Sequence, residues 1–228
     1  MNAGIADAAN LAWLLAARLE GWGGEGILTA YAAERLPITD QVSHFAMDHA
    51  HAMTKARKSV SDEIEADGPE ADAYRAAVGK TTHDLNVQQY CCAGLNFGYF
   101  YQGSPIIVYD GEAAPPPYMM GEFTPSTVPG ALLPHIWLAD RRSLYDAMGP
   151  CYTQLRLDPD IDVSSLTNAG AAACVPLTVL DVSSSEAAKL FARNLILVRP
   201  DQHVAWRGNG VSANPGRLVD IIRGAESA

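Results

Sequence analysis

Basic residues are scarce in this sequence. Lysine and arginine together number 16, against 26 aspartates and glutamates, and the formal net charge is -10 over 228 residues. A protein that binds nucleic acid needs clustered positive charge, and the chain contains no basic stripe. We therefore expect no nucleic-acid partner.

Long apolar runs are missing as well. The uninterrupted apolar stretch from Leu11 to Ala17 is too short to cross a bilayer, and no lysine or arginine precedes it. The sequence therefore predicts neither a transmembrane helix nor a signal peptide. We expect a soluble, cytoplasmic protein without a membrane partner.

Cysteine and histidine are few, and their spacing argues against metal and disulfide chemistry. There is no C-x-x-C pair and no cysteine with a histidine at zinc-site spacing, so we expect buried free thiols at Cys91, Cys92, Cys151 and Cys174. A redox role for the adjacent pair is the weaker alternative, because neighbouring cysteines bridge only through a strained ring. His49 and His51 point in different directions on the helix that they share with His44, so we expect a polar helix face and no metal ion.

The N-terminal stretch MNAGIADAANLAWLLAARLEG predicts one well-delimited helix. Asn2 can cap its start and Gly21 can end it. Its apolar side chains recur at helical spacing and fill most of the circumference: Ile5, Ala8, Leu11, Ala12, Trp13, Leu14, Leu15 and Leu19. A helix that is apolar on nearly all sides needs cover on all sides, so we expect it to lie inside a larger protein.

This stretch resembles the signature GMNxGIxDAxNLAWKLA of the FAD-dependent aromatic-ring hydroxylases, which are single-component flavoprotein monooxygenases. The resemblance implies that the start of the helix lines the pyrimidine edge of the flavin through the backbone of Met1, Asn2, Ala3 and Gly4. The unpaired N–H groups and the positive end of the helix dipole would favour the negative charge that reduced flavin carries near N1 and the C2 carbonyl oxygen. A capped core helix without a ligand is the alternative.

A second match follows. The pattern from Ile27 to about Arg57 predicts a long helix interrupted near Pro37, and its segment LTAYAAERLPITDQV resembles the family's LxxYxxERxPxxxxv helix through Tyr31, Glu34 and Arg35. The resemblance implies that Glu34 or Arg35 holds this helix on the flavin domain. A solvated face with local ion pairs is an equally open interpretation.

The middle of the chain predicts a connection and a strap. Residues 59–84 are polar and alanine-rich, with a break at Gly68-Pro69, and we expect a surface connection made of short helices. Residues 85–150 are rich in proline and turns, and we expect an extended strap that resembles the family's GxxYxxSPiv and PHxWL segments. Ala131 stands where that family commonly has an arginine. His135 and Trp137 are interpreted as structural residues rather than catalytic ones.

Residues 151–228 predict an α/β unit. Strands are expected at 152–157, 175–182, 194–200 and 203–208, and helices at 163–173, 184–192 and 214–225, the strand at 175–182 being a buried one. This order resembles a thioredoxin-like domain, the C-terminal domain of these hydroxylases. Cys151 and Cys174 are isolated, and Asn194 stands where an active thioredoxin has its cis-proline, so we expect no thiol exchange.

The expected fold class is therefore α/β, with a helical remnant of a flavin-binding domain over residues 1–84, the strap over 85–150, and the thioredoxin-like domain over 151–228. The resemblance implies part of an FAD-dependent monooxygenase that hydroxylates a phenolic or polycyclic aromatic substrate with NAD(P)H and O2. No G-x-G-x-x-G motif follows a strand, so we expect the chain alone to be inactive and to need an N-terminal flavin-binding segment as its partner. No catalytic residue is assigned. The alternative is a non-enzymatic interaction or dimerisation module that forms a homodimer.

Overall fold

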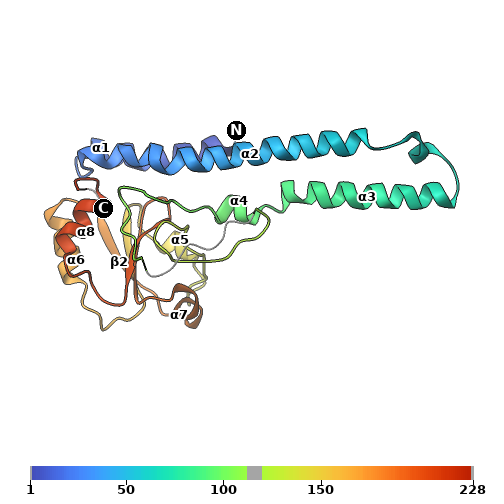
Figure 1. Cartoon of the computed structure of the whole chain (residues 1–228). Helices are drawn as coiled ribbons and strands as arrows, with labels where there is room; N and C mark the ends of the chain where they lie inside the picture. Colours follow the sequence, from blue (N-terminus) through green and yellow to red (C-terminus); the bar gives the residue numbers. More distant parts are fainter. Residues whose placement is uncertain (1, 112–119, 227–228) are drawn as a thin grey trace.

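The computed structural model describes residues 2–111 and 120–226. A body built around one sheet carries a long arm of two helices, α2 and α3, which extend side by side away from it (Figure 1). The helices are α1 (Asn2–Leu19), α2 (Thr29–Lys58), α3 (Pro69–Tyr90), α4 (Ala93–Phe97), α5 (Leu144–Ala147), α6 (Ser164–Ala172), α7 (Ser185–Phe191) and α8 (Pro215–Ile222), with short 3-10 turns η1 (Glu25–Leu28) and η2 (Asp62–Glu65). The strands are β1 (Tyr152–Arg156), β2 (Leu177–Asp181), β3 (Leu195–Val198) and β4 (Val204–Gly208).

The helix α1 is buried on one side only. Trp13, Leu14 and Ala17 are buried in the body, whereas Ile5 is 67% exposed and Leu19 is 85% exposed. The sequence predicted an apolar helix that needs cover all round, and this chain provides that cover for one face. The opposite face remains an exposed apolar stripe.

The helix α2 corrects the prediction of a break near Pro37. It runs without interruption from Thr29 to Lys58 and contains Pro37 within it. A proline inside a helix removes one backbone hydrogen bond, but tertiary contacts can hold the helix through that position. Here Glu34, Arg35 and Ile38 on either side of the proline are buried, and this anchorage explains why the helix continues.

The helix α3 replaces much of the predicted surface connection. It begins at Pro69, a favourable first position, after Gly68 with a positive φ of 104°, and it runs through residue 84 to Tyr90. The prediction of short helices over residues 59–84 is therefore wrong beyond the break at Gly68-Pro69. The alanines and the ion pair between Lys80 and Asp84, one helical turn apart, favour this single helix.

The sheet has strand order β2-β1-β3-β4, with β1 and β2 parallel and the other pairs antiparallel. The strands and helices predicted in residues 151–228 are all present, with Ser184 capping α7 and Pro215 in the first turn of α8. The prediction that β2 is buried is wrong. It lies at the sheet edge, where Val179 is 38% exposed, because only one side of an edge strand is paired.

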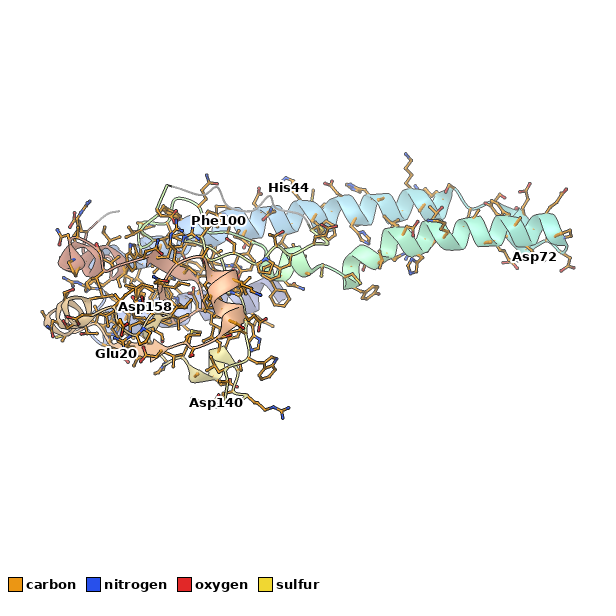
Figure 2. The ribbon with its side chains drawn as sticks, turned by 90° about the horizontal axis from the view of Figure 1, so that it is seen from below. Glu20, His44, Asp72, Phe100, Asp140 and Asp158 are labelled. Carbon is orange, nitrogen blue, oxygen red and sulfur yellow. The ribbon has the colours of Figure 1, made fainter. Side chains whose placement is uncertain are left out.

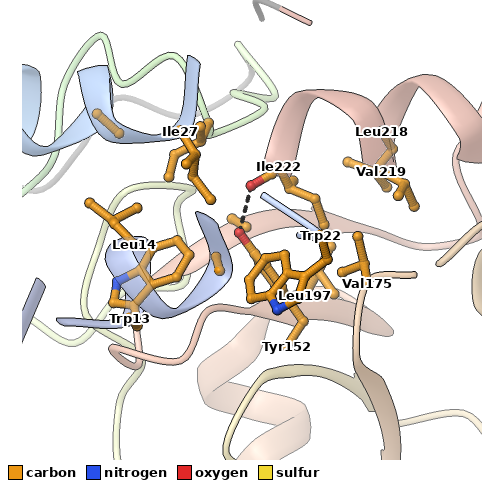
Figure 3. Packing of buried hydrophobic residues seen from close by; sticks show 14 of the residues in the cluster. Trp13, Leu14, Trp22, Ile27, Tyr152, Val175, Leu197, Leu218, Val219 and Ile222 are labelled. Atoms are coloured by element: carbon orange, nitrogen blue, oxygen red, sulfur yellow. Dashed lines mark hydrogen bonds between the residues drawn. The ribbon is translucent and has the colours of Figure 1, made fainter. Parts of the chain in front are cut away.

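The core has two layers, one on each face of the sheet. On one face, α1, α6 and α8 pack against the inward side chains of β1 and β3; on the other, α5, α7 and part of the strap do so. Figure 3 shows the first layer. The ring of Trp13 stacks on that of Trp22 with 6.5 Å between the ring centroids, and it packs edge-on against the ring of Tyr152 with 6.1 Å between the centroids. The Tyr152 hydroxyl donates to the carbonyl of Ile222 at 2.8 Å, so α1, β1 and α8 join in one cluster.

The prediction that residues 85–150 are extended throughout is wrong, because the end of α3, α4 and α5 lie within them. Two segments of this strap lie beside β4. The N–H of Val108 donates to the carbonyl of Ala205, and that of Gly130 donates to the carbonyl of Val204. A backbone bridge also links Phe100 to Ala131, the position where the family commonly has an arginine. The strap thus covers the edge of the sheet opposite to β2.

Within residues 2–111 and 120–226, none of the helices is both long and apolar enough to cross a membrane.

Candidate functional site

The first turn of α1 holds the residues that the resemblance assigns to the flavin. Met1 lies outside the described residues, while Asn2, Ala3 and Gly4 begin the helix. The first turn contains no acidic residue, and a Cβ added at Gly4 would meet no atom within 4 Å. Open space, free N–H groups and the positive end of the helix dipole form a donor set that fits the anionic edge of a flavin.

One turn further along, α1 is tied to α2 by an ion pair. The Arg35 guanidinium donates to Asp7 at 2.8 Å and to the Tyr101 hydroxyl at 3.2 Å, and it lies over the ring of Tyr99 at 5.5 Å. Burial alone would lower the pKa of Arg35, but Tyr101 and the Asp7 carboxylate outweigh it and raise that pKa above its ordinary value. Arg35 therefore stays charged and anchored.

Glu34, the neighbour of Arg35, lies at the centre of a second, fully buried cluster. Its carboxylate accepts two hydrogen bonds from Arg199, at 2.5 and 2.8 Å, and one from the Ser104 hydroxyl at 2.6 Å. Arg199 also donates to both oxygens of Asp201, at 2.7 and 3.0 Å. The side chains of Glu34 and Arg199 have no exposed surface, so the interpretation of Glu34 as part of a solvated face is wrong.

Aromatic rings and Asn10 complete this cluster. The Arg199 guanidinium lies 4.9 Å from the ring of Trp13 and 5.3 Å from that of Tyr101. The Asn10 amide donates to Glu34 at 2.8 Å and to Asp201 at 3.2 Å. We call the set of Asn10, Glu34, Arg199 and Asp201 the buried charge cluster; it joins α1, α2 and the connection between β3 and β4.

Arg199 and Asp201 hold each other ionised. Burial alone would lower the pKa of Arg199, but Asp201 and Glu34 hold it well above its ordinary value. Burial alone would raise the pKa of the Asp201 carboxyl, yet Arg199 and His203 hold it well below its usual range. Sequence reasoning missed Asn10, Arg199 and Asp201 as a site; the only signals were the family signature around Asn10 and the hairpin match LVRPDQHVAWRG.

The histidines of α2 do not come together. His44 contacts Asp40 on its own helix, and His49 pairs with Gln89 of α3 at 2.5 Å. Among the described residues, no group of three or more histidine, cysteine, aspartate or glutamate side chains is placed to hold a metal ion. Figure 2 shows His44 on α2 near the body and Asp72 at the far end of the arm.

The cysteines differ from their predicted burial. All four thiols are free, but Cys91 and Cys174 are exposed, since they lie at a helix end and in a turn rather than in the core. Burial, and then Glu20, raise the pKa of the Cys151 thiol. His135 is hydrogen-bonded to Ser143 at 2.9 Å yet lies on the surface beside Trp137, which is 65% exposed.

A groove of about 440 Å³ runs along α2 where it meets α3 and α4. It is lined mainly by apolar side chains, with one imidazole and one amide: Val42, Phe45, Ala46, His49, Ala50, Met53, Gln89 and Leu95. An apolar groove with few polar groups is typical of small-molecule sites.

Two family profiles match separate parts of the chain. The profile described as "FAD binding domain" matches residues 1–46, and the profile described as "Aromatic-ring hydroxylase, C-terminal" matches residues 126–224. The first covers α1 and the part of α2 that carries Glu34 and Arg35, and the second covers the sheet.

Curated relatives agree with these profiles. The FAD-dependent monooxygenase opdD of Penicillium oxalicum is 28% identical over 222 residues, which cover 93% of this chain and 42% of that protein. The phenol 2-monooxygenase of Pseudomonas sp. is 28% identical over 264 residues, which cover 98% of this chain and 42% of that protein. The chain thus spans less than half the length of these relatives.

Solved structures show the same arrangement. RebC with bound 7-carboxy-K252c superimposes with a TM-score of 0.88 at 35% identity, covering 98% of this chain and 42% of RebC. The flavin-dependent monooxygenase PieE, in complex with FAD and substrate, superimposes with a TM-score of 0.78 at 28% identity, covering 97% of this chain and 43% of PieE. The profiles, relatives and structures together show that the chain is similar to FAD-dependent aromatic-ring hydroxylases over part of their FAD-binding domain and over their C-terminal domain.

Proposed function

We propose that this chain supplies the flavin-facing helix and the C-terminal domain of a monooxygenase that hydroxylates a phenolic or polycyclic aromatic ring. The observation that carries the proposal is the start of α1, where Asn2, Ala3 and Gly4 offer backbone donors to an anion in open space. When bound and reduced by NAD(P)H, FAD would supply the chemistry that transfers oxygen from O2 to the ring. The chain's own part is to bind the pyrimidine edge of the flavin through Met1, Asn2, Ala3 and Gly4 and to stabilise negative charge there.

The substrate class follows from the groove and from the relatives. The apolar groove along α2 offers Phe45, Met53 and Leu95 to an aromatic ring, and His49 and Gln89 as hydrogen-bonding groups. RebC binds 7-carboxy-K252c in its structure, and the phenol 2-monooxygenase of Pseudomonas sp. is named for phenol. A phenolic or polycyclic substrate fits both.

The partner of the chain is an upstream flavin-binding segment. Ile5, Leu15 and Leu19 form an exposed apolar stripe on α1, and the FAD-binding profile matches this helix, which supports the proposal. Trp13 belongs to the chain's own core, so a substitution there would test folding rather than docking. The stripe is the surface that the upstream segment would cover. A homodimer through the same stripe stays an alternative.

Co-expression tests this function. The chain produced together with an upstream flavin-domain fragment of a relative should give a soluble complex with bound FAD, measured by its absorbance spectrum. Leu15→Glu combined with Leu19→Glu should abolish the complex, because it places two charges in a buried contact. Val179→Glu on the exposed edge of β2 is the matched control and should leave the complex intact. If the chain forms no complex with the flavin-domain fragment, that result would instead favour the alternative of a non-enzymatic interaction module.

The C-terminal domain is proposed to be thioredoxin-like and inactive in thiol exchange. The order β2-β1-β3-β4, with one parallel pair and a following hairpin, supports that assignment. Cys151 and Cys174 lie apart in the chain and neither has a second cysteine three residues away, which thioredoxin chemistry needs. The chain should therefore fail to catalyse insulin reduction by dithiothreitol. Turnover that Cys151→Ser or Cys174→Ser removes would overturn the assignment.

A further inference from the structure

We propose that the buried charge cluster positions α1, so that the connection between β3 and β4 sets the place of the flavin-facing helix start. Asn10 is the positioning residue, and Glu34, Arg199 and Asp201 are the frame that holds it. The consequence for flavin rests on the proposed function. The anchoring of α1 does not, because it is a property of this chain alone.

The geometry joins three distant parts of the chain at one amide. Asn10 is 1% exposed, and its Nδ2 atom donates to Glu34 of α2 at 2.8 Å and to Asp201 of the β3–β4 connection at 3.2 Å. The first turn of α1 lies about 12 Å away, since a helix rises about 1.5 Å per residue. A helix is stiff over this length, so a shift at Asn10 moves the helix start by a similar distance.

The charge balance of the cluster requires donors from outside it. Two carboxyl groups, those of Glu34 and Asp201, surround the single guanidinium of Arg199 in a site that is almost entirely buried. The excess negative charge must be met by N–H and O–H groups, because a buried charge without partners is costly. The Asn10 amide and the Ser104 hydroxyl meet it at Glu34, and the Asn10 amide and the backbone N–H of His203 meet it at Asp201. Position 10 of α1 therefore needs a hydrogen-bond donor that can satisfy the carboxyl oxygens of Glu34 and Asp201.

The frame itself has little freedom. The flat guanidinium of Arg199 is held by carboxylates at its edges and lies near the rings of Trp13 and Tyr101, at 4.9 and 5.3 Å. Such two-sided, charge-assisted hydrogen bonding fixes direction as well as distance. Apolar contacts of Trp13 and Leu14 also hold α1, but they are not directional. The ion pair of Asp7 with Arg35 ties α1 to α2, whereas the Asn10 amide also joins α1 to the β3–β4 connection.

Hydrogen exchange on the full chain separates these contributions. Asn10→Asp keeps the size of the side chain, removes both N–H donors and adds a third carboxylate. We expect peptides covering residues 2–12 to exchange at least about tenfold faster in this variant, with β1 and β3 unchanged, since a hydrogen bond to a buried charge contributes at least that factor. Asn10→Ala, which removes the donors without adding charge, should act in the same direction and covers the case in which Asn10→Asp does not fold.

The control is a buried arginine that lies in the sheet itself and makes no hydrogen bond to α1 among the described residues. Arg207 on β4 donates to Asp110 at 2.6 Å and to Thr127, and neither partner belongs to α1 or α2. Arg207→Gln should speed exchange in β4 and the strap and leave residues 2–12 unchanged. The proposal fails if the Asn10 variants leave α1 exchange unchanged, or if they raise exchange uniformly across the sheet, which a merely stabilising role predicts.

A second measurement links the anchoring to flavin. In the complex with the upstream fragment, Asn10→Ala should raise the dissociation constant of FAD at least about tenfold, whereas Arg207→Gln should not. An unchanged dissociation constant in Asn10→Ala would overturn the positioning role toward flavin. If the unaltered complex binds no FAD at all, the proposed function fails, and the exchange experiment still decides whether Asn10 anchors α1.

Discussion

The stability of the fold at acid pH depends mainly on one side chain, the carboxyl group of Asp201. Burial would raise the pKa of its carboxyl, but Arg199 and His203 hold that pKa well below the usual range. A carboxyl whose pKa is lower in the folded than in the unfolded chain stabilises the fold at pH values above its unfolded pKa of about 3.9. That stability is lost as the pH falls toward the folded pKa. The exposed aspartates with lowered pKa values, such as Asp140 and Asp162, contribute little because solvent screens their partners.

We therefore expect the free energy of unfolding, measured by urea titration, to fall as the pH is lowered from 5 to 2. Asp201→Asn should cost about 2 kcal/mol at pH 7, because it weakens the two charge-assisted hydrogen bonds from Arg199 to residue 201 while the pair of Arg199 with Glu34 remains. The same variant should flatten the dependence below about pH 4. Equal slopes in the two proteins would show that another carboxyl carries the acid response.

Gly224 is a second position where a single residue decides local structure, because there is no room for a side chain there. Its φ is 71°, and a Cβ there would lie 2.4 Å from the backbone nitrogen of Ile27. The close approach lets the Gly26 N–H donate to the Gly224 carbonyl at 2.9 Å and ties the end of α8 to the turn after α1. Gly224→Ala should cost about 2 kcal/mol through strain and lost contact. Gly210→Ala, where a Cβ would meet no atom within 4 Å, should be nearly neutral in the same urea titration.

At the scale of elements, local sequence pattern predicted the sheet far better than the arm. Ser184 caps α7 and Pro215 starts α8 as their sequence signals indicate, because caps and turns depend on neighbouring residues. The continuation of α2 through Pro37 depends on contacts that are remote in sequence. Glu34 meets Arg199 at a separation of 165 residues, which no local spacing reveals. The motif around Glu34 could be recognised, but its buried partner could not.

The arm formed by α2 and α3 should be the least stable element. Among the described side chains of residues 43–58 and 69–90, only Ala71 is buried, so little apolar contact holds the two helices together. Hydrogen exchange in the arm should be faster than in β3, whose residues are all buried. Exchange as slow as that of β3 would contradict this expectation.

A substitution in α3 tests the same idea from the opposite direction. Gly79 lies inside α3, and a Cβ there would meet no atom within 4 Å. Gly79→Ala should therefore stabilise the helix by about 0.7 kcal/mol and slow exchange in the arm about threefold. Exchange in the sheet should not change, which serves as the internal control.

At the scale of the whole molecule, the chain has an anchored core and an uncovered face. The buried charge cluster and the rings of Trp13, Trp22 and Tyr152 hold α1 on the body. The opposite side of α1 exposes Ile5, Leu15 and Leu19. This exposed apolar face is the surface that the proposed upstream segment would cover.

The isolated chain should therefore self-associate and hold little FAD. Self-association follows from the stripe, and Leu15→Glu with Leu19→Glu should convert the chain to a monomer in sedimentation velocity.

Weak flavin binding follows from the size of the site, because one helix terminus contributes on the order of 1 kcal/mol to binding an anion. A stoichiometrically yellow preparation of the unaltered chain would show that it carries a far larger part of the flavin site than the start of α1. A colourless, monodisperse monomer would show that the stripe needs no partner.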